Sequence, residues 1–173
     1  MTDFSKNCYF LSVRFSVFFI LSGLVHAETI FGKVIGVADG DTITILVVEG
    51  TTKTPRKIRM NGIDAPEKAQ AFGNRSKEAM SDLAYGKETE ADCRKVDRYV
   101  CVAGVDVGLK LIEQGLAWHY KAYQRDQKPA DRVGYDIAET EAREARRGLW
   151  RDLGTNAPPV PPWEWRKAKR AGV

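Results

Sequence analysis

The sequence is poor in the residues that build zinc sites and nucleophile–base pairs. It has 3 cysteines and 2 histidines in 173 residues, and beyond residue 27 the cysteines are Cys93 and Cys101. A structural zinc site takes four ligands, so two isolated cysteines argue against one. A Walker phosphate loop and a Gly-x-Ser-x-Gly elbow are also missing. These absences argue against zinc-finger proteins, P-loop nucleotide hydrolases and elbow-type serine hydrolases.

Long hydrophobic runs are scarce too. The apolar run from Phe15 to Val25 is shorter than the about 20 residues of a transmembrane helix. It follows the basic residues Lys6 and Arg14 and ends at Val25-His26-Ala27, which has small residues at the positions that signal peptidase reads. The pattern predicts that residues 1–27 are a secretory signal peptide, with secretion or transfer to the periplasm. An uncleaved N-terminal anchor is the alternative.

The composition is that of a folded, mildly basic protein. Charged residues make up 29% and aromatic residues 10% of the chain, which is typical of a globular domain. With 27 Lys and Arg against 23 Asp and Glu, the net charge is +4 and the pI is about 9.0. This balance favours a polyanionic partner, although charge alone does not identify nucleic acid.

The first part of the chain after residue 27 has the composition of β-strands. A β-branched stretch between Ile30 and Val37 precedes the polar turn Ala38-Asp39-Gly40-Asp41, and another follows from Thr42 to Val48. Glu49 to Pro55 is predicted to be a loop, and Arg56 to Asn61 a third short strand. The three strands predict a meander.

Helical periodicity then alternates with a second β-region. Apolar residues share one helical face in residues 72–83, 107–112 and 133–147, while residues 88–102 are strand-like around a turn at Asp97. The pattern predicts a small α+β domain, mainly β, over residues 28–151. Residues 152–173 form a basic tail containing Pro and Trp. In it we expect Trp163 and Trp165 to pack on the domain, and Arg166 to Arg170 to lie in solvent.

Acidic and basic residues cluster in two nearby motifs. The first is Asp39-Gly40-Asp41-Thr42; the second is Arg59 followed by Ile63-Asp64-Ala65-Pro66-Glu67. Taken singly, each has a structural interpretation. Asp and Gly are common in hairpin turns, and Asp64 could cap a helix that has Pro66 in its first turn.

Together the motifs indicate phosphodiester chemistry. Asp41 and Asp64 offer carboxylates to a hard divalent cation, with a backbone carbonyl as a further ligand. Arg59 has the planar fork that grips two phosphate oxygens. Glu67 is placed to orient or deprotonate a water beside the cation.

These motifs resemble those of the staphylococcal nuclease family. The resemblance rests on Asp-Gly-Asp-Thr, the arginine and Ile-Asp-x-Pro-Glu at this spacing, together with Gly115-Leu116-Ala117-Trp118 and Gly148-Leu149-Trp150. It covers nearly all of residues 28–151. It implies a five-stranded OB-fold barrel with three helices. It also implies a monomer that uses one calcium ion to cut DNA and RNA to 3′-phosphate products.

The resemblance also implies roles for single residues. Asp41, Asp64 and the Ala65 carbonyl are the implied calcium ligands, and Asp39 lies at the edge of that shell. Arg59 and Glu67 are the implied catalytic residues.

The pattern breaks at a second arginine that the family carries after a tyrosine. Here the chain reads Asp97-Arg98-Tyr99-Val100-Cys101, and about six residues are missing after Tyr99, which shortens one barrel strand. Tyr99 and Arg98 are the predicted substrate-binding residues of this region, and Arg98 or Arg94 is a candidate to replace the lost charge. Without a replacement we expect weak cleavage or none. The alternatives are then an inactive module that binds polyanions or nucleic acid, or an envelope protein accessory to exopolysaccharide synthesis.

Cys93 and Cys101 lie at equal distances from Asp97 in the predicted hairpin. In an oxidising compartment two such cysteines can pair. Sequence does not provide the geometry that a disulfide requires, so the bonded and free states both remain open.

Overall fold

The computed structural model describes residues 27–95, 99–103 and 106–172. In this part of the chain the strands are β1 (Ala27–Val37), β2 (Thr42–Glu49), β3 (Thr52–Met60), β4 (Ile63–Asp64), β5 (Glu88–Lys95), β6 (Tyr99–Ala103) and β7 (Trp118–His119). The α-helices are α1 (Gly73–Ala84), α2 (Val107–Glu113), α3 (Pro129–Glu144) and α4 (Pro162–Arg170), and the 3₁₀ segments are η1 (Lys121–Asp126) and η2 (Gly148–Asp152).

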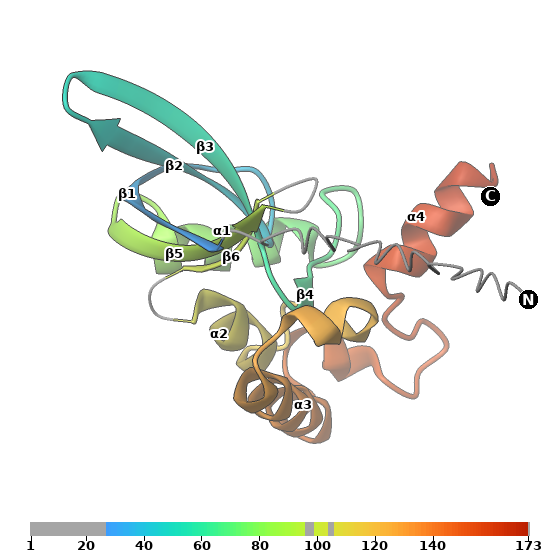
Figure 1. Ribbon diagram of the computed structural model, residues 1–173. Helices are drawn as coiled ribbons and strands as arrows, with labels where there is room; N and C mark the ends of the chain where they lie inside the picture. Colours follow the sequence, from blue (N-terminus) through green and yellow to red (C-terminus); the bar gives the residue numbers. More distant parts are fainter. Residues whose placement is uncertain (1–26, 96–98, 104–105, 173) are drawn as a thin grey trace, which may run out of the picture.

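The larger sheet is a barrel in which pairing runs β1-β2-β3-β6-β5 and returns to β1 (Figure 1). Neighbouring strands are antiparallel except β3 and β6, which are parallel. This seam has two residue pairs, Arg59 with Val100 and Met60 with Cys101. The predicted α+β class and OB-type barrel are confirmed, and β6, the strand expected to be short, has 5 residues.

The β2–β3 hairpin is longer than the sequence indicated. β3 begins at Thr52, so the predicted loop over Glu49 to Pro55 is wrong: Pro55 lies inside the strand, opposite Leu46. Proline is tolerated there because β6 pairs with the last two residues of β3, so that among the described strands none pairs with the other edge of Pro55. In Figure 1 this hairpin projects from the body of the molecule.

Inward-facing isoleucines fill the barrel. Ile43, Ile45 and Ile58 have no exposed surface, and Met80 of α1 covers one end of the same core. Burying an aliphatic side chain of this size contributes about 1.5–3 kcal/mol. Ile43 and Ile45 lie two positions apart on β2, so both face inward; the strand itself was predicted from its β-branched residues.

A small second sheet places a site residue. β4 pairs with β7, so that Ile63 lies opposite His119 and Asp64 opposite Trp118. No pattern in the sequence indicated these two-residue strands. A second buried cluster lies beside them and includes Trp118, Leu149 and Trp150. Asp64 is therefore held on rigid backbone.

The C-terminal tail forms a helix that packs on the domain. The resemblance implied three helices, whereas α4 is a fourth. The Trp163 ring lies 6.5 Å from Trp118 and 5.4 Å from Tyr120, measured between ring centroids, as expected for the packing of Trp163. None of the described helices is long and apolar enough to cross a membrane.

Some predictions fall outside the described residues. The signal segment up to residue 26, the turn at Asp97 and Arg98 all lie there, as does the side chain of Tyr99. The β5–β6 register places Cys93 opposite Cys101, as predicted, and Cys93 is disulfide-bonded. A bond between these two cysteines stays a prediction.

Candidate active site

The turn between β1 and β2 fixes the carboxylate of Asp41. The Asp41 amide donates to Oδ1 of Asp39 at 3.1 Å, and the Thr42 hydroxyl donates to Oδ1 of Asp41 at 2.8 Å. The Ala65 amide donates to Oδ2 of Asp41 at 3.2 Å. The bond from Ala65 links the two acidic motifs, whose bonded residues are 24 positions apart in the sequence.

Gly40 permits this turn to approach α1. A Cβ atom built on Gly40 would lie 1.8 Å from the Ser76 hydroxyl oxygen and 2.7 Å from Ala65 Cβ. Gly40 is therefore required by close packing against Ser76 and Ala65, in addition to the preference of turns for glycine.

We expect Gly40→Ala to lower the free energy of unfolding by about 1–3 kcal/mol, because the added methyl group overpacks a buried contact. Chemical denaturation measures the change. Gly36→Ala is the matched control, since its Cβ would lie at an ordinary 3.5 Å from Thr44 Cβ. Equal stability of the two variants would contradict the packing argument.

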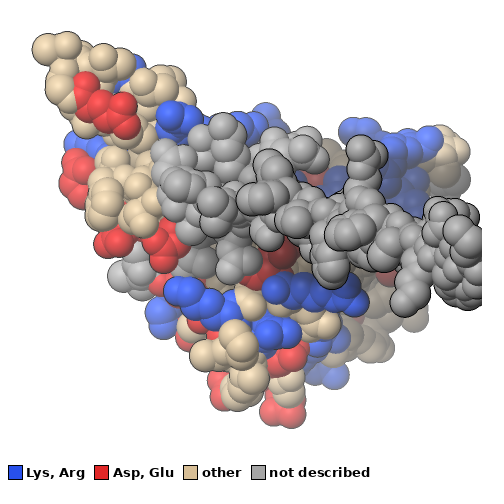
Figure 2. Space-filling model, in the orientation of Figure 1, with Lys and Arg blue, Asp and Glu red and all other residues tan. Residues whose placement is uncertain are grey.

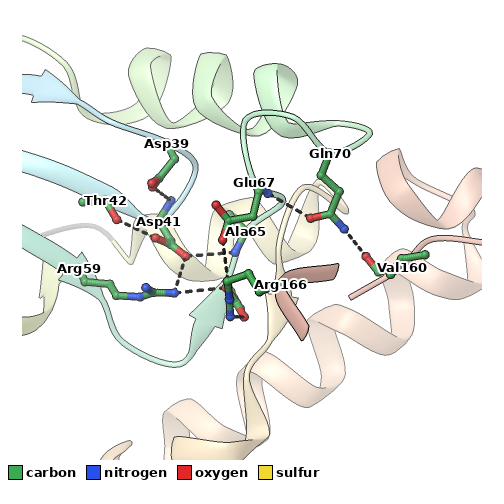
Figure 3. A network of polar contacts seen from close by, with 10 residues as sticks. Asp39, Asp41, Thr42, Arg59, Ala65, Glu67, Gln70, Val160 and Arg166 are labelled. Carbon is green, nitrogen blue, oxygen red and sulfur yellow. Dashed lines mark hydrogen bonds and ion pairs between the residues drawn. The ribbon is translucent and has the colours of Figure 1, made fainter. Parts of the chain in front are cut away.

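Arg59 on β3 bridges the two carboxylates. Its Nη2 lies 3.2 Å from Asp41 Oδ2 and 3.2 Å from Asp64 Oδ1 (Figure 3). Its side chain is 35% exposed, whereas that of Asp64 is fully buried. The structure thus brings together Asp41, Arg59 and Asp64, as the sequence predicted.

Glu67 lies in the loop between β4 and α1. Its amide donates to the side chain of Gln70 at 3.1 Å, and the Gln70 amide donates back to the Glu67 carbonyl at 2.8 Å. The α1 helix begins at Gly73, so the interpretation of Asp64 as a helix cap is wrong. The Glu67 carboxylate is 36% exposed and remains accessible.

Arg166 of α4 completes the cluster. Its Nη1 donates to Asp64 Oδ1 at 3.0 Å and to Glu67 Oε1 at 2.8 Å, and its Nη2 donates to Asp64 Oδ2 at 2.6 Å. The prediction that Arg166 lies in solvent is therefore wrong. The predicted packing of Trp163 was the one signal in the sequence that brought this segment near the domain.

The cluster opens on a cleft of about 420 Å³. The cleft is lined by Asp39, Asp41, Thr42, Lys57, Arg59, Ala65, Pro66 and Glu67. Both lining cations come from β3, and all three acidic lining residues come from the two motifs. A charged cleft of mixed sign suits a cation together with an anionic substrate.

Burial perturbs the ionisation of Asp41. Removal from water raises the pKa of this carboxyl to about 6, Arg59 opposes the rise, and the charge of Asp39 adds to it. The hydrogen bonds that Arg166 donates to Asp64 raise the pKa of Arg166 above its ordinary value. At neutral pH both Asp41 and Arg166 are charged.

We expect Asp41→Asn to stabilise the cation-free protein at pH 8. The difference between the ordinary pKa of 3.8 and about 6 corresponds to about 3 kcal/mol of penalty on the ionised form. The penalty is present above pH 6 and disappears as pH falls towards 4, because the folded state binds the proton more tightly than the unfolded state.

Chemical denaturation of the wild type and Asp41→Asn in chelator, at pH 8 and pH 4.5, measures the gain in free energy of unfolding. This gain should be largest at pH 8 and small at pH 4.5. A gain that is the same at both pH values would show that titration of Asp41 is not its source.

The donor set fits a hard cation only in part. Asp41 in the β1–β2 turn and Asp64 in β4 present oxygens to one nitrogen of Arg59, so this guanidinium stands where a cation held by both carboxylates would lie. Among the described residues, no three His, Cys, Asp or Glu side chains are grouped to hold a metal ion. Backbone oxygen, with the Ala65 carbonyl as candidate, and water would have to supply the remaining ligands.

The fold and the cluster define a class: a small OB-type barrel protein whose cleft combines paired carboxylates with arginines. A family model described as "Staphylococcal nuclease homologue" matches residues 57–152. The chain belongs to this family of SNase-like nucleases.

Named relatives extend the match over most of the chain. A protein of Shigella flexneri named "Micrococcal nuclease" is 34% identical over 80% of this chain and 82% of its own length. An "Uncharacterized endonuclease" of Escherichia coli is 36% identical over 88% and 95%. "Protein ParB" of Escherichia coli is 34% identical over 79% and 78%.

Proposed function

We propose that the chain is an exported, calcium-dependent nuclease that hydrolyses phosphodiester bonds of DNA and RNA and leaves 3′-phosphate ends. The observation that carries this proposal is that Asp41, Arg59 and Glu67 line one open cleft, with the buried Asp64 in contact with Arg59. The family and the nuclease names of the relatives support it.

The proposed roles follow from the geometry. Asp41 and Asp64 would hold the calcium ion, with the Ala65 carbonyl. When bound, the ion polarises a phosphoryl oxygen and offsets developing negative charge. Arg59 exchanges its two carboxylate partners for oxygens of the scissile phosphate, which its fork can bind in pairs.

Glu67 is the proposed general base. Its accessible carboxylate faces the cleft, where it can accept a proton from the attacking water. The water oxygen bonds to phosphorus, the bond from phosphorus to the 5′ oxygen breaks, and that oxygen takes a proton from solvent and leaves as a hydroxyl. The products are one strand with a 3′-phosphate and one with a 5′-hydroxyl.

The surface charge supports an anionic substrate. Figure 2 shows Lys and Arg side chains gathered over the end of the molecule that α4 forms. The last turn of this helix carries Lys167, Lys169 and Arg170. Contacts with the phosphate backbone of this kind add affinity without sequence preference.

A non-catalytic nucleic-acid-binding module is the second candidate. The missing arginine after Tyr99 favours it, because a cation at a phosphoryl transition state is worth about 10³–10⁵ in rate. An envelope role in exopolysaccharide synthesis has no comparable support in the described site.

The test is the chemistry of the products. We expect the purified chain to cut single-stranded DNA and RNA oligonucleotides in calcium, and mass spectrometry to find 3′-phosphate ends. A folded chain that retards the oligonucleotides on a gel without cutting them would favour the binding module.

A further inference from the structure

Arg166 joins the two acidic residues that have different proposed roles. Its fork takes both oxygens of Asp64, a proposed cation ligand, and one of its nitrogens also reaches the carboxylate of Glu67, the proposed base. It comes from α4, outside the segment that the family model matches. Its side chain is 30% exposed, so it is half-buried at the mouth of the cluster (Figure 3).

The start of α4 is tied to the loop that carries Glu67. The side-chain amide of Gln70 donates to the Val160 carbonyl at 2.5 Å, while its oxygen accepts from the Glu67 amide. On the other side, Trp163 packs on Trp118, which pairs with Asp64. The helix is therefore docked against both acidic residues.

We propose that Arg166 is a positioning residue of the nuclease site, which holds the carboxylates of Asp64 and Glu67 in a fixed relation and makes the C-terminal helix part of that site. The inference rests on the proposed function. Among the described residues, Arg166 is the side chain that contacts the Glu67 carboxylate. Without it, Glu67 is free to turn into solvent.

Arg166 should have opposite effects on cleavage, which it assists, and on calcium affinity, which it lowers. A calcium ion held by Asp64 lies close to the guanidinium of Arg166, and like charges at such a separation repel. Loss of Arg166 should therefore slow cleavage without weakening calcium binding. A residue that merely stabilised the fold would not produce this combination.

The experiment compares Arg166→Ala, Arg166→Lys and the charge-matched control Lys53→Ala in the full chain. Lys53 is exposed on β3, and its loss changes the net charge equally. We expect Arg166→Ala to lower kcat about 100-fold, as a misplaced catalytic group does, with KM nearly unchanged. Isothermal titration should show a calcium Kd that is unchanged or up to about tenfold lower. Arg166→Lys should recover part of kcat, because a single ammonium can reach one carboxylate at a time.

Three results would overturn the inference. Cleavage by Arg166→Ala at the wild-type rate or faster would show that the arginine does not assist the reaction. If Arg166→Ala bound calcium more weakly and had a lower Tm, and Trp163→Ala showed the same changes, Arg166 would only dock the helix. Equal losses in Lys53→Ala would assign the effect to net charge alone. If the wild-type chain neither cuts nor binds calcium, the proposed function itself fails, whereas an active wild type with an unaffected Arg166→Ala refutes the positioning role alone.

Discussion

Replacement of Arg59 by alanine is expected to lower the rate of calcium-dependent cleavage by about 10³- to 10⁵-fold. Arg59 comes from a barrel strand, is 35% exposed and points at the two buried aspartates. Its strand position is thus fixed, and its guanidinium can exchange the aspartates for phosphate oxygens. Because a second arginine is missing after Tyr99, Lys57 is the other cation among the described residues that line the cleft.

Cleavage kinetics of Arg59→Ala and Arg59→Lys test this expectation. Lysine keeps the charge but cannot bind two phosphate oxygens with a planar fork, so we expect it to restore only a small part of the rate. The control is Lys53→Ala, an exposed cation on the same strand far from the cleft. If the cleavage rate of Arg59→Ala fell by less than about tenfold, another cation would be stabilising the charge of the transition state.

Replacement of Asp64 by asparagine is expected to weaken calcium binding by about 100-fold or more, and to abolish cleavage with it. Changes around a metal ligand already cost about 10- to 100-fold in affinity, and here one of two anionic ligands is lost. Asp64 is fully buried and paired with Trp118 across a rigid two-stranded sheet. A neighbouring carboxylate cannot swing into its place.

Calcium titration and circular dichroism of Asp64→Asn separate binding from folding. The two guanidiniums that lose their partner are 30% and 35% exposed, so water can solvate them and we expect the fold to persist. Asp82→Asn, an exposed change on α1, is the charge-matched control. Wild-type calcium affinity in a folded Asp64→Asn protein would remove this residue from the proposed site.

Local signals in the sequence predicted most of the fold. The β-branched composition predicted strands β1 and β2. The spacing of apolar residues along one helical face predicted helices α1, α2 and α3. The family motifs predicted that Asp41, Arg59 and Asp64 lie together. All three lie within one stretch of barrel and connecting loops, so the spacing of the motifs already constrained them.

Contacts between distant segments were not predictable in the same way. Arg166 lies 102 residues from Asp64, in a basic run whose pattern is that of a solvated helix face. Nothing in the spacing indicates which of its cations turns inward. The predicted loop that ended at Pro55 was wrong for a related reason. Whether a strand can contain proline depends on whether the neighbouring strand edge is paired, and only the barrel determines that.

The most direct test of the central claim compares the wild-type chain with Glu67→Gln on a single-stranded DNA oligonucleotide, in calcium and in chelator. Glutamine keeps the size of the side chain and removes the proton acceptor. We expect the wild type to cut only in calcium, and Glu67→Gln to cut about 10²- to 10⁴-fold more slowly while it binds the oligonucleotide equally well. Cleavage that continues in chelator, or that is as fast in Glu67→Gln as in the wild type, would contradict a calcium-dependent nuclease with Glu67 as its base.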